Sequence, residues 1–141
     1  MGWILLGKEE IEQLEQAVKF YYRLGDLYSA SALAALDGEL RYMRYHADLS
    51  EPARAIRPMA YWFGFQLAAF GWRWAEDPSG AIAVISPEGR TACRLLQLLK
   101  TLFDDDRAPY FSELTASMAA GELVELDGIV KNLEVKADEF N

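Results

Sequence analysis

The residues that most often carry catalysis are scarce in this chain. Histidine, the usual general base, occurs once, as His46, beside Arg44 and Tyr45. The single cysteine, Cys93, precedes Arg94, a neighbour that can lower the pKa of a thiol. Nothing in the sequence brings Cys93 and His46 together as a nucleophile and its base. We interpret both as structural or surface residues and expect a non-enzymatic protein, with carboxylate-only chemistry as the remaining enzymatic alternative.

An acidic run and a glycine-containing turn are the remaining candidates for metal or phosphate chemistry. The acids at residues 104–106 are followed by Arg107, Ala108 and Pro109, whereas a calcium loop needs oxygen ligands at alternating positions around a central glycine. Residues 86–90 contain one glycine and are better explained as a turn that closes a hairpin than as a phosphate loop. We therefore predict no cofactor, and no catalytic, cofactor-binding or metal residue.

Tyrosine and arginine cluster in the one basic stretch of an acidic chain. Residues 41–57 hold four arginines and His46 against Asp48 and Glu51, while the whole chain has a net charge of −8. Tyrosine and arginine are enriched at protein-binding hot spots. The alternative interpretation is a solvated face with scattered ion pairs. The candidate partner-binding residues of this stretch are Arg41, Tyr42, Arg44, Tyr45, Arg54 and Arg57.

A second candidate surface is aromatic. Seven of the 18 aromatic residues lie between Tyr61 and Trp74. If residues 71–76 form a strand, Trp72 and Trp74 point to one face and Arg73 to the other. A face covered by helices makes both tryptophans core residues, which we favour. An open face makes them a platform for a partner or a planar ligand.

Length and composition predict one globular domain over residues 1–141, with a frayed tail at residues 136–141. One cysteine allows no intramolecular disulfide, and the first seven residues lack the positive region of a secretory signal, so we expect a cytoplasmic protein. The apolar stretch at residues 58–72 is shorter than the roughly 20 residues of a membrane span. The negative charge disfavours direct binding to nucleic acid.

The elements that would position these candidates are mostly helical. Hydrophobic periodicity predicts helices over residues 8–24, 27–36, 39–47, 58–70, 92–103, 110–120 and 122–135, with a short one beginning at Ser50. We expect Asp37-Gly38 to end the second helix and Pro58 to bend the chain before the central one. Residues 40–46 are ambiguous, because they also alternate as a strand would.

Residues 71–76 and 81–86 change to a period of two and predict a β-hairpin, to which residues 3–6 could add a third strand. The corner at residues 118–123 resembles a helix-turn-helix, but the acids of the following segment favour an αα-hairpin over a DNA reader. The predicted fold class is mainly α (α+β): a single-domain helical bundle of six or seven helices around a central buried helix, with one β-hairpin.

The C-terminal half resembles a family of small uncharacterised bacterial proteins, a domain of unknown function. The shared pattern is an aromatic segment at residues 70–74, a leucine-rich helix at 94–103, Asp106-Arg107, a helix ending at Gly121, and an apolar helix at 123–133. The spacing departs from the family at residues 108–110, and the first 55 residues show no match. The resemblance implies no activity.

These observations favour a non-enzymatic protein–protein interaction, accessory or inhibitory factor, with another protein as partner and a homodimer as an alternative. A second hypothesis is a small-ligand-binding sensor with a Trp-rich pocket. A third is an acidic, nucleic-acid-mimicking decoy of phage or mobile-element origin.

Overall fold

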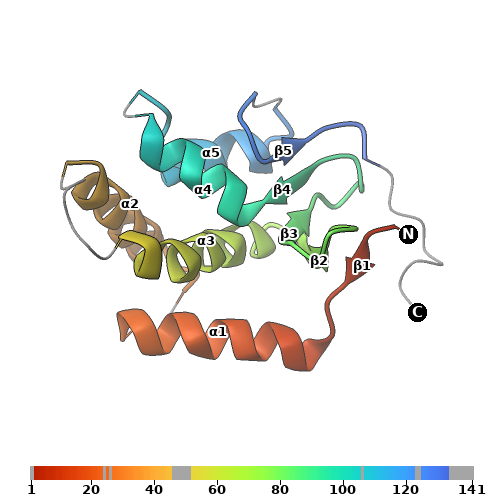
Figure 1. Cartoon of the computed structure of the whole chain (residues 1–141), viewed down its shortest axis with the longest axis horizontal. Coiled ribbons are helices and arrows are strands. Elements are labelled where there is room, and N and C mark those ends of the chain that lie inside the picture. Colours follow the sequence, from red (N-terminus) through yellow and green to blue (C-terminus); the bar gives the residue numbers. More distant parts are fainter. Residues whose placement is uncertain are drawn as a thin grey trace.

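The computed structural model describes residues 2–23, 25, 27–45, 52–105, 107–122 and 125–133, and only the backbone of residues 52–55. Its helices are α1 (Lys8–Tyr22), α2 (Ala30–Tyr45), α3 (Pro52–Ala68), α4 (Leu95–Asp104) and α5 (Phe111–Ala119). Its strands are β1 (Ile4–Leu5), β2 (Arg73–Glu76), β3 (Ile82–Ile85), β4 (Ala92–Arg94) and β5 (Ile129–Val130). Figure 1 shows most of the helical mass beside the sheet, with α1 as a separate rod along α3.

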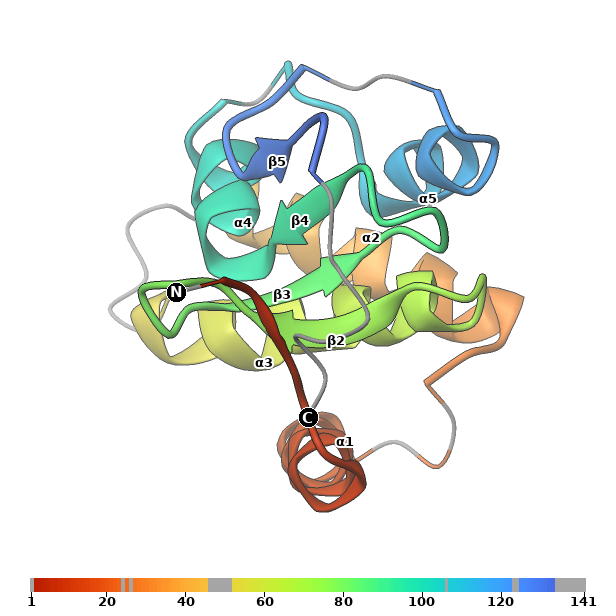
Figure 2. The same cartoon turned by 90° about the vertical axis from the view of Figure 1, so that its right-hand side faces the viewer.

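The strands form one antiparallel sheet in the order β1-β2-β3-β4-β5, of which Figure 2 shows β2 to β5 and Figure 1 labels β1. The expected hairpin is confirmed as β2 and β3, in which Trp74 lies opposite Val84. Val84 also lies opposite Cys93 of β4, and β5 pairs Ile129 with Cys93 at one edge. At the other edge β1 pairs with β2, so the additional strand within residues 3–6 is present.

The two faces of the sheet contribute to different cores. Trp74, Val84 and Cys93 pack with the helices in the larger cluster. The opposite face contributes a smaller cluster, formed by Trp3, Ala75, Ala83, Ile85 and Ala92. Because successive strand residues point to opposite faces, the aromatic side of β2 meets the helices, while the alanine side meets the N-terminal segment.

Helix α3 is the centre of the helical layer and contacts α1, α2, α4, α5, β2 and β3. Residues 59–67 are all buried, and the side-chain amide of Gln66 donates a hydrogen bond to the carbonyl of Leu27. The predicted bend at Pro58 is wrong, since Pro58 lies inside the helix. An internal proline costs about 3 kcal/mol, but burying each large apolar side chain of the following run contributes about 1.5–3 kcal/mol.

Helix α2 joins two predicted helices, so the expected stop at Asp37-Gly38 is wrong. Leu40 and Met43 continue the buried stripe that Leu36 begins. Their burial outweighs the roughly 1 kcal/mol that glycine costs inside a helix. The helical interpretation of residues 39–45 is thereby confirmed.

Two strands lie where the sequence predicts helix, and the first of them is β4. Residues 92–94 form β4, and the helix predicted from Thr91 begins only at Leu95. Ala92 and Cys93 are fully buried, where an unpaired backbone would leave its polar groups without hydrogen bonds. Pairing with β3 supplies those bonds.

The helix predicted over residues 122–135 is also wrong, because its middle forms β5. Gly128 has a φ of +96°, and a Cβ added there would lie 2.6 Å from the backbone nitrogen of Leu98. Its carbonyl accepts a hydrogen bond of 2.7 Å from the amide of Arg94. Gly128 therefore makes a turn against α4 and is not a weak position in a helix.

The predicted bundle of six or seven helices with one hairpin is therefore wrong. The described part of the chain holds five helices and a five-stranded antiparallel sheet. The predicted αα-hairpin is wrong, because its second helix is not formed. The predictions of α1 and of the end of α5 at Gly121 are confirmed. His46 and the tail at residues 136–141 lie outside the described residues, and the single-domain assignment stays a prediction. Of the described helices, none has the length and apolar character required to cross a membrane.

Candidate functional site

Three of the predicted partner-binding residues share an exposed face of α2. Residues three or four apart on a helix are neighbours, so Tyr45 lies beside both Arg41 and Tyr42. Tyr42 is 51% exposed, Tyr45 is 72% exposed, and Arg41 is also exposed. We call Arg41, Tyr42 and Tyr45 the α2 surface. It presents a positive charge beside two amphipathic rings, with Tyr45 in the middle.

Arg44 supports this surface from behind. Its Nε donates a hydrogen bond of 2.8 Å to the carbonyl of Leu102, and its Nη2 donates one of 3.2 Å to the carbonyl of Pro109. Leu102 is in the last turn of α4, where carbonyls lack partners within the helix. Nη1 is buried and has no partner among the described residues. Arg44 is thus a structural link between α2 and the α4–α5 connection, not a free contact residue.

Tyr110, which was not predicted from the sequence, completes the support. The guanidinium carbons of Arg41 and Arg44 lie 5.3 Å and 4.6 Å from the centre of its ring, within the range of cation–π attraction. A hydrogen bond from Arg41 lowers the pKa of the Tyr110 hydroxyl. The sequence near Tyr110 offers one hint of this contact, namely that the tyrosine stands at the start of a predicted helix, the segment that forms α5.

Asp37 fixes α2 to α5. Its carboxylate accepts a hydrogen bond of 3.1 Å from the amide of Ser112, in the first turn of α5. A negative charge is favourable there, because the first amides of a helix lack partners and the helix dipole is positive at that end. The acid that was expected to end α2 therefore caps a different helix.

The other arginine candidates are not part of this cluster of contacts. Arg57 is exposed on α3, and its charge partly offsets the rise in the pKa of Tyr61 that burial causes. The side chain of Arg54 lies outside the described residues. Arg41 and Arg44 are therefore the only members of the basic stretch that the described contacts bring together.

Both candidate tryptophans face the helical core. Trp74 is 4% exposed, and its ring centre lies 4.8 Å from that of Phe65 and 6.4 Å from that of Tyr61. A Cβ at Gly64 would come within 2.4 Å of the Trp74 ring, so the glycine makes room for it. Trp72 is 6% exposed. The two tryptophans form no open platform.

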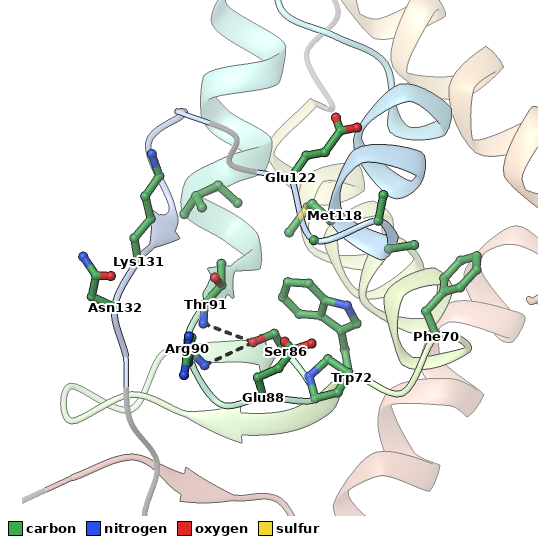
Figure 3. Close-up of a pocket in the computed structure, with 15 residues that line it drawn as sticks. Phe70, Trp72, Ser86, Glu88, Arg90, Thr91, Met118, Glu122, Lys131 and Asn132 are labelled. Atoms are coloured by element: carbon green, nitrogen blue, oxygen red, sulfur yellow. Dashed lines mark hydrogen bonds between the residues drawn. The ribbon is translucent and has the colours of Figure 1, made fainter.

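Trp72 does reach a cavity of about 510 Å³ at one end of the sheet, where β2 and β4 begin and β3 and β5 end. The walls come from four segments: Phe70 and Trp72; residues 86–88 with Arg90 and Thr91; residues 118–122; and Ile129 with Lys131 and Asn132. Figure 3 shows Arg90 and Lys131 on one side of this cavity, and Trp72 and Phe70 on the other. The buried Met118 adds a thioether to the apolar side.

Asp77 and Cys93 both have structural roles. Oxygen Oδ1 of Asp77 accepts hydrogen bonds from the amides of Ser79 and Ala81, and Oδ2 accepts one of 2.8 Å from Arg94. Burial alone would raise the pKa of Asp77, but these hydrogen bonds, together with one that the Ser79 hydroxyl donates to Oδ1, outweigh it and hold the pKa below its usual range. Cys93 is fully buried, which raises the pKa of its thiol. Within the described residues no group of three or more acids, histidines or cysteines is placed to hold a metal.

Comparisons of this chain with models of protein families, with curated proteins and with solved structures find no match. The resemblance to an uncharacterised bacterial family therefore stays a prediction.

Proposed function

We propose that this protein is a non-enzymatic binding protein that uses the α2 surface to dock an acidic region of a partner protein. The observation that carries the proposal is the rigid support beneath three exposed side chains of the hot-spot type. Arg44 and Tyr110 hold the end of α2 in place, and Asp37 ties its middle to α5.

Rigid support matters because binding loses free energy when side chains and segments become ordered in the complex. A surface that is ordered beforehand loses less, typically by about 0.5–1.5 kcal/mol for each side chain already held in place. Tyrosine adds large contact area with only two rotatable side-chain bonds. Arg41, which is held against Tyr110, has the first advantage, and Tyr42 and Tyr45 supply the second.

Charge favours an acidic partner. Arg41 is exposed on α2, and the support below it contains the second guanidinium of Arg44. A carboxylate of the partner could accept hydrogen bonds from Arg41 while its neighbouring side chains cover the rings of Tyr42 and Tyr45. Because Arg41 is exposed, salt should weaken the complex.

The test places a photo-crosslinking amino acid at position 45 of the full chain in its native host, with position 20 as the matched control. Phe20 is 88% exposed on α1, so it reports capture that any exposed aromatic site would give. We expect one protein to be captured at position 45 and not at position 20, and to be lost with Arg41→Ala.

The captured partner is then purified and its affinity measured by calorimetry. Arg41→Ala and Tyr45→Ala should each weaken binding by about tenfold or more, whereas Phe20→Ala should not change it. Equal capture at positions 45 and 20, or equal affinity of the three variants, contradicts the proposal. If position 45 captures a second copy of this chain, the proposal of an acidic partner is wrong and the α2 surface mediates self-association.

A further inference from the structure

We infer that the cavity at the end of the sheet binds a free aromatic α-amino acid. This inference is independent of the α2 surface, because none of the residues that line the cavity belongs to that surface or its support. A volume of about 510 Å³ lies within the range of roughly 300–1,000 Å³ that small-molecule sites occupy.

The cavity is shaped by the backbone. Tight turns surround it, and four of them contain a residue of positive φ: Gly71 at +92°, Gly89 at +75°, Gly121 at +78° and Asn132 at +59°. The α5 end is closed by hydrogen bonds from the amides of Gly121 and Glu122 to the carbonyls of Met118 and Ser117, a pattern that satisfies the end of a helix. The site is therefore formed before any ligand arrives.

The chemistry of the walls has three parts. Trp72 and Met118 are buried and supply an apolar floor, while Phe70 is 53% exposed at the rim. Aromatic rings pack favourably on indole and on thioether groups. This floor selects a planar apolar group.

Opposite charges lie near that floor. Figure 3 shows Glu88 between Arg90 and Trp72. Although they are only two residues apart, Glu88 and Arg90 form no ion pair with each other or with another described residue. Lys131, on the same side as Arg90, is paired with Glu125 at 2.9 Å. Arg90 is thus the cation of the wall that is available to a ligand, and Glu88 and the more distant Glu122 are the available anions.

An α-amino acid carries the three complementary groups on one carbon. Its carboxylate would accept hydrogen bonds from Arg90, its ammonium would donate to Glu88, and an aromatic side chain would lie against Trp72. A carboxylic acid without the amine leaves Glu88 without a partner, and an amine without the carboxylate does the same to Arg90. Zwitterionic ligands should therefore bind best.

Calorimetry with the full chain tests this with three probes: L-phenylalanine, 3-phenylpropionate and 2-phenylethylamine. We expect L-phenylalanine to bind at least about tenfold more tightly than either analogue, since each analogue loses one charge-assisted contact. The indole N–H signal of Trp72, assigned with Trp72→Phe, should shift in the NMR spectrum on binding.

Two wall variants and two matched controls locate the site. Arg90→Ala and Glu88→Gln should each weaken L-phenylalanine binding by about tenfold. The exposed Arg107→Ala and Glu113→Gln lie outside the lining and should leave it unchanged. Circular dichroism confirms that each variant is folded.

No binding of L-phenylalanine, equal binding of the three probes, or equal effects of wall and control variants would each overturn the inference. Arg41→Ala separates it from the proposed function. That variant should lose the protein partner and keep the amino acid, whereas Arg90→Ala should do the reverse.

Discussion

The α2 surface and the cavity are built by different means. Side chains that cross between elements support the α2 surface, namely Arg44 to two carbonyls and Asp37 to the start of α5. Turns of positive φ shape the cavity, with Gly121 on its wall and Gly71 between the lining residues Phe70 and Trp72. The first arrangement depends on particular side-chain atoms. The second depends on the conformations that the backbone can adopt.

This difference determines how each region should fail. Truncating one supporting side chain should loosen the α2 surface and leave the cavity intact. Adding a Cβ at one glycine should distort the cavity and leave the α2 surface intact. Three substitutions test the contrast, in order of decreasing effect.

Gly128→Ala should give the largest loss. The new Cβ would lie 2.6 Å from the Leu98 nitrogen and 2.9 Å from its Cα, at a φ of +96°. Strained backbone and forced packing should together lower the free energy of unfolding by about 3 kcal/mol or more. Urea unfolding measures this loss, and binding of L-phenylalanine reports the displaced wall at residues 129–132.

The matched control is Gly38→Ala. Gly38 lies inside α2 with no atom within 4 Å of the added Cβ. Alanine should therefore raise the free energy of unfolding by about 0.5–1 kcal/mol. If the two alanine substitutions change stability by the same amount and in the same direction, the backbone account of the cavity is wrong.

Arg44→Ala should give an intermediate loss of about 2 kcal/mol in the free energy of unfolding, because the carbonyls of Leu102 and Pro109 lose their donors. Partner binding should also weaken, although the partner need not touch Arg44. Arg41→Ala removes an exposed side chain with one cation–π contact, to Tyr110, and should lower the free energy of unfolding by only about 0.5–1 kcal/mol. Equal stability of the two variants would show that Arg44 does not stabilise the packing of α2 on the α4–α5 connection.

Substitution of Asp77 should give the smallest change in stability. Asp77 lies in the turn between β2 and β3, which combines side-chain hydrogen bonds with a glycine of positive φ, Gly80. Its pKa is lower in the folded chain than in the unfolded chain, so the unfolded chain takes up the proton first as the pH falls. The stability that Asp77 contributes is present above the unfolded pKa of about 4 and is lost as the pH falls through the folded value.

Asp77→Asn should therefore be less stable than the wild type at neutral pH and should lose less further stability below about pH 5. Arg94→Ala, which removes one donor to the carboxylate, should also make the fall shallower. Urea unfolding between pH 7 and pH 3 measures these slopes. Parallel slopes for the wild type and Asp77→Asn would contradict this role for the carboxylate.

Local signals predicted some elements well. The apolar spacing of α1, the glycine that ends α5, and the turn residues between β2 and β3 each act within a few residues, and each prediction is confirmed. Gly38 and Pro58 are equally local signals, yet α2 and α3 run through them. Burial of the residues that follow contributes more free energy than these two breakers cost.

The strands β4 and β5 could not be found in this way. Each strand has only two or three residues. Strand β4 is stabilised by pairing with β3 and with β5, which is distant in the sequence. Strand β5 is stabilised by that same pairing and by the close packing of the preceding Gly128 on α4. The turn signal Asp127-Gly128 was present, but the surrounding apolar spacing was interpreted as a helix. The predicted helical bundle failed for this reason.

The sequence by itself determined the side-chain types of both regions, including the tyrosines and arginines of residues 41–45 and the aromatic run that ends at Trp74. Only the tertiary structure decided their roles. It turned Arg44 into a support and buried Trp74. It also brought Trp72 to a cavity whose other walls come from three distant segments. The physical reason is that side-chain chemistry is encoded residue by residue, whereas burial and proximity depend on which segments pack together.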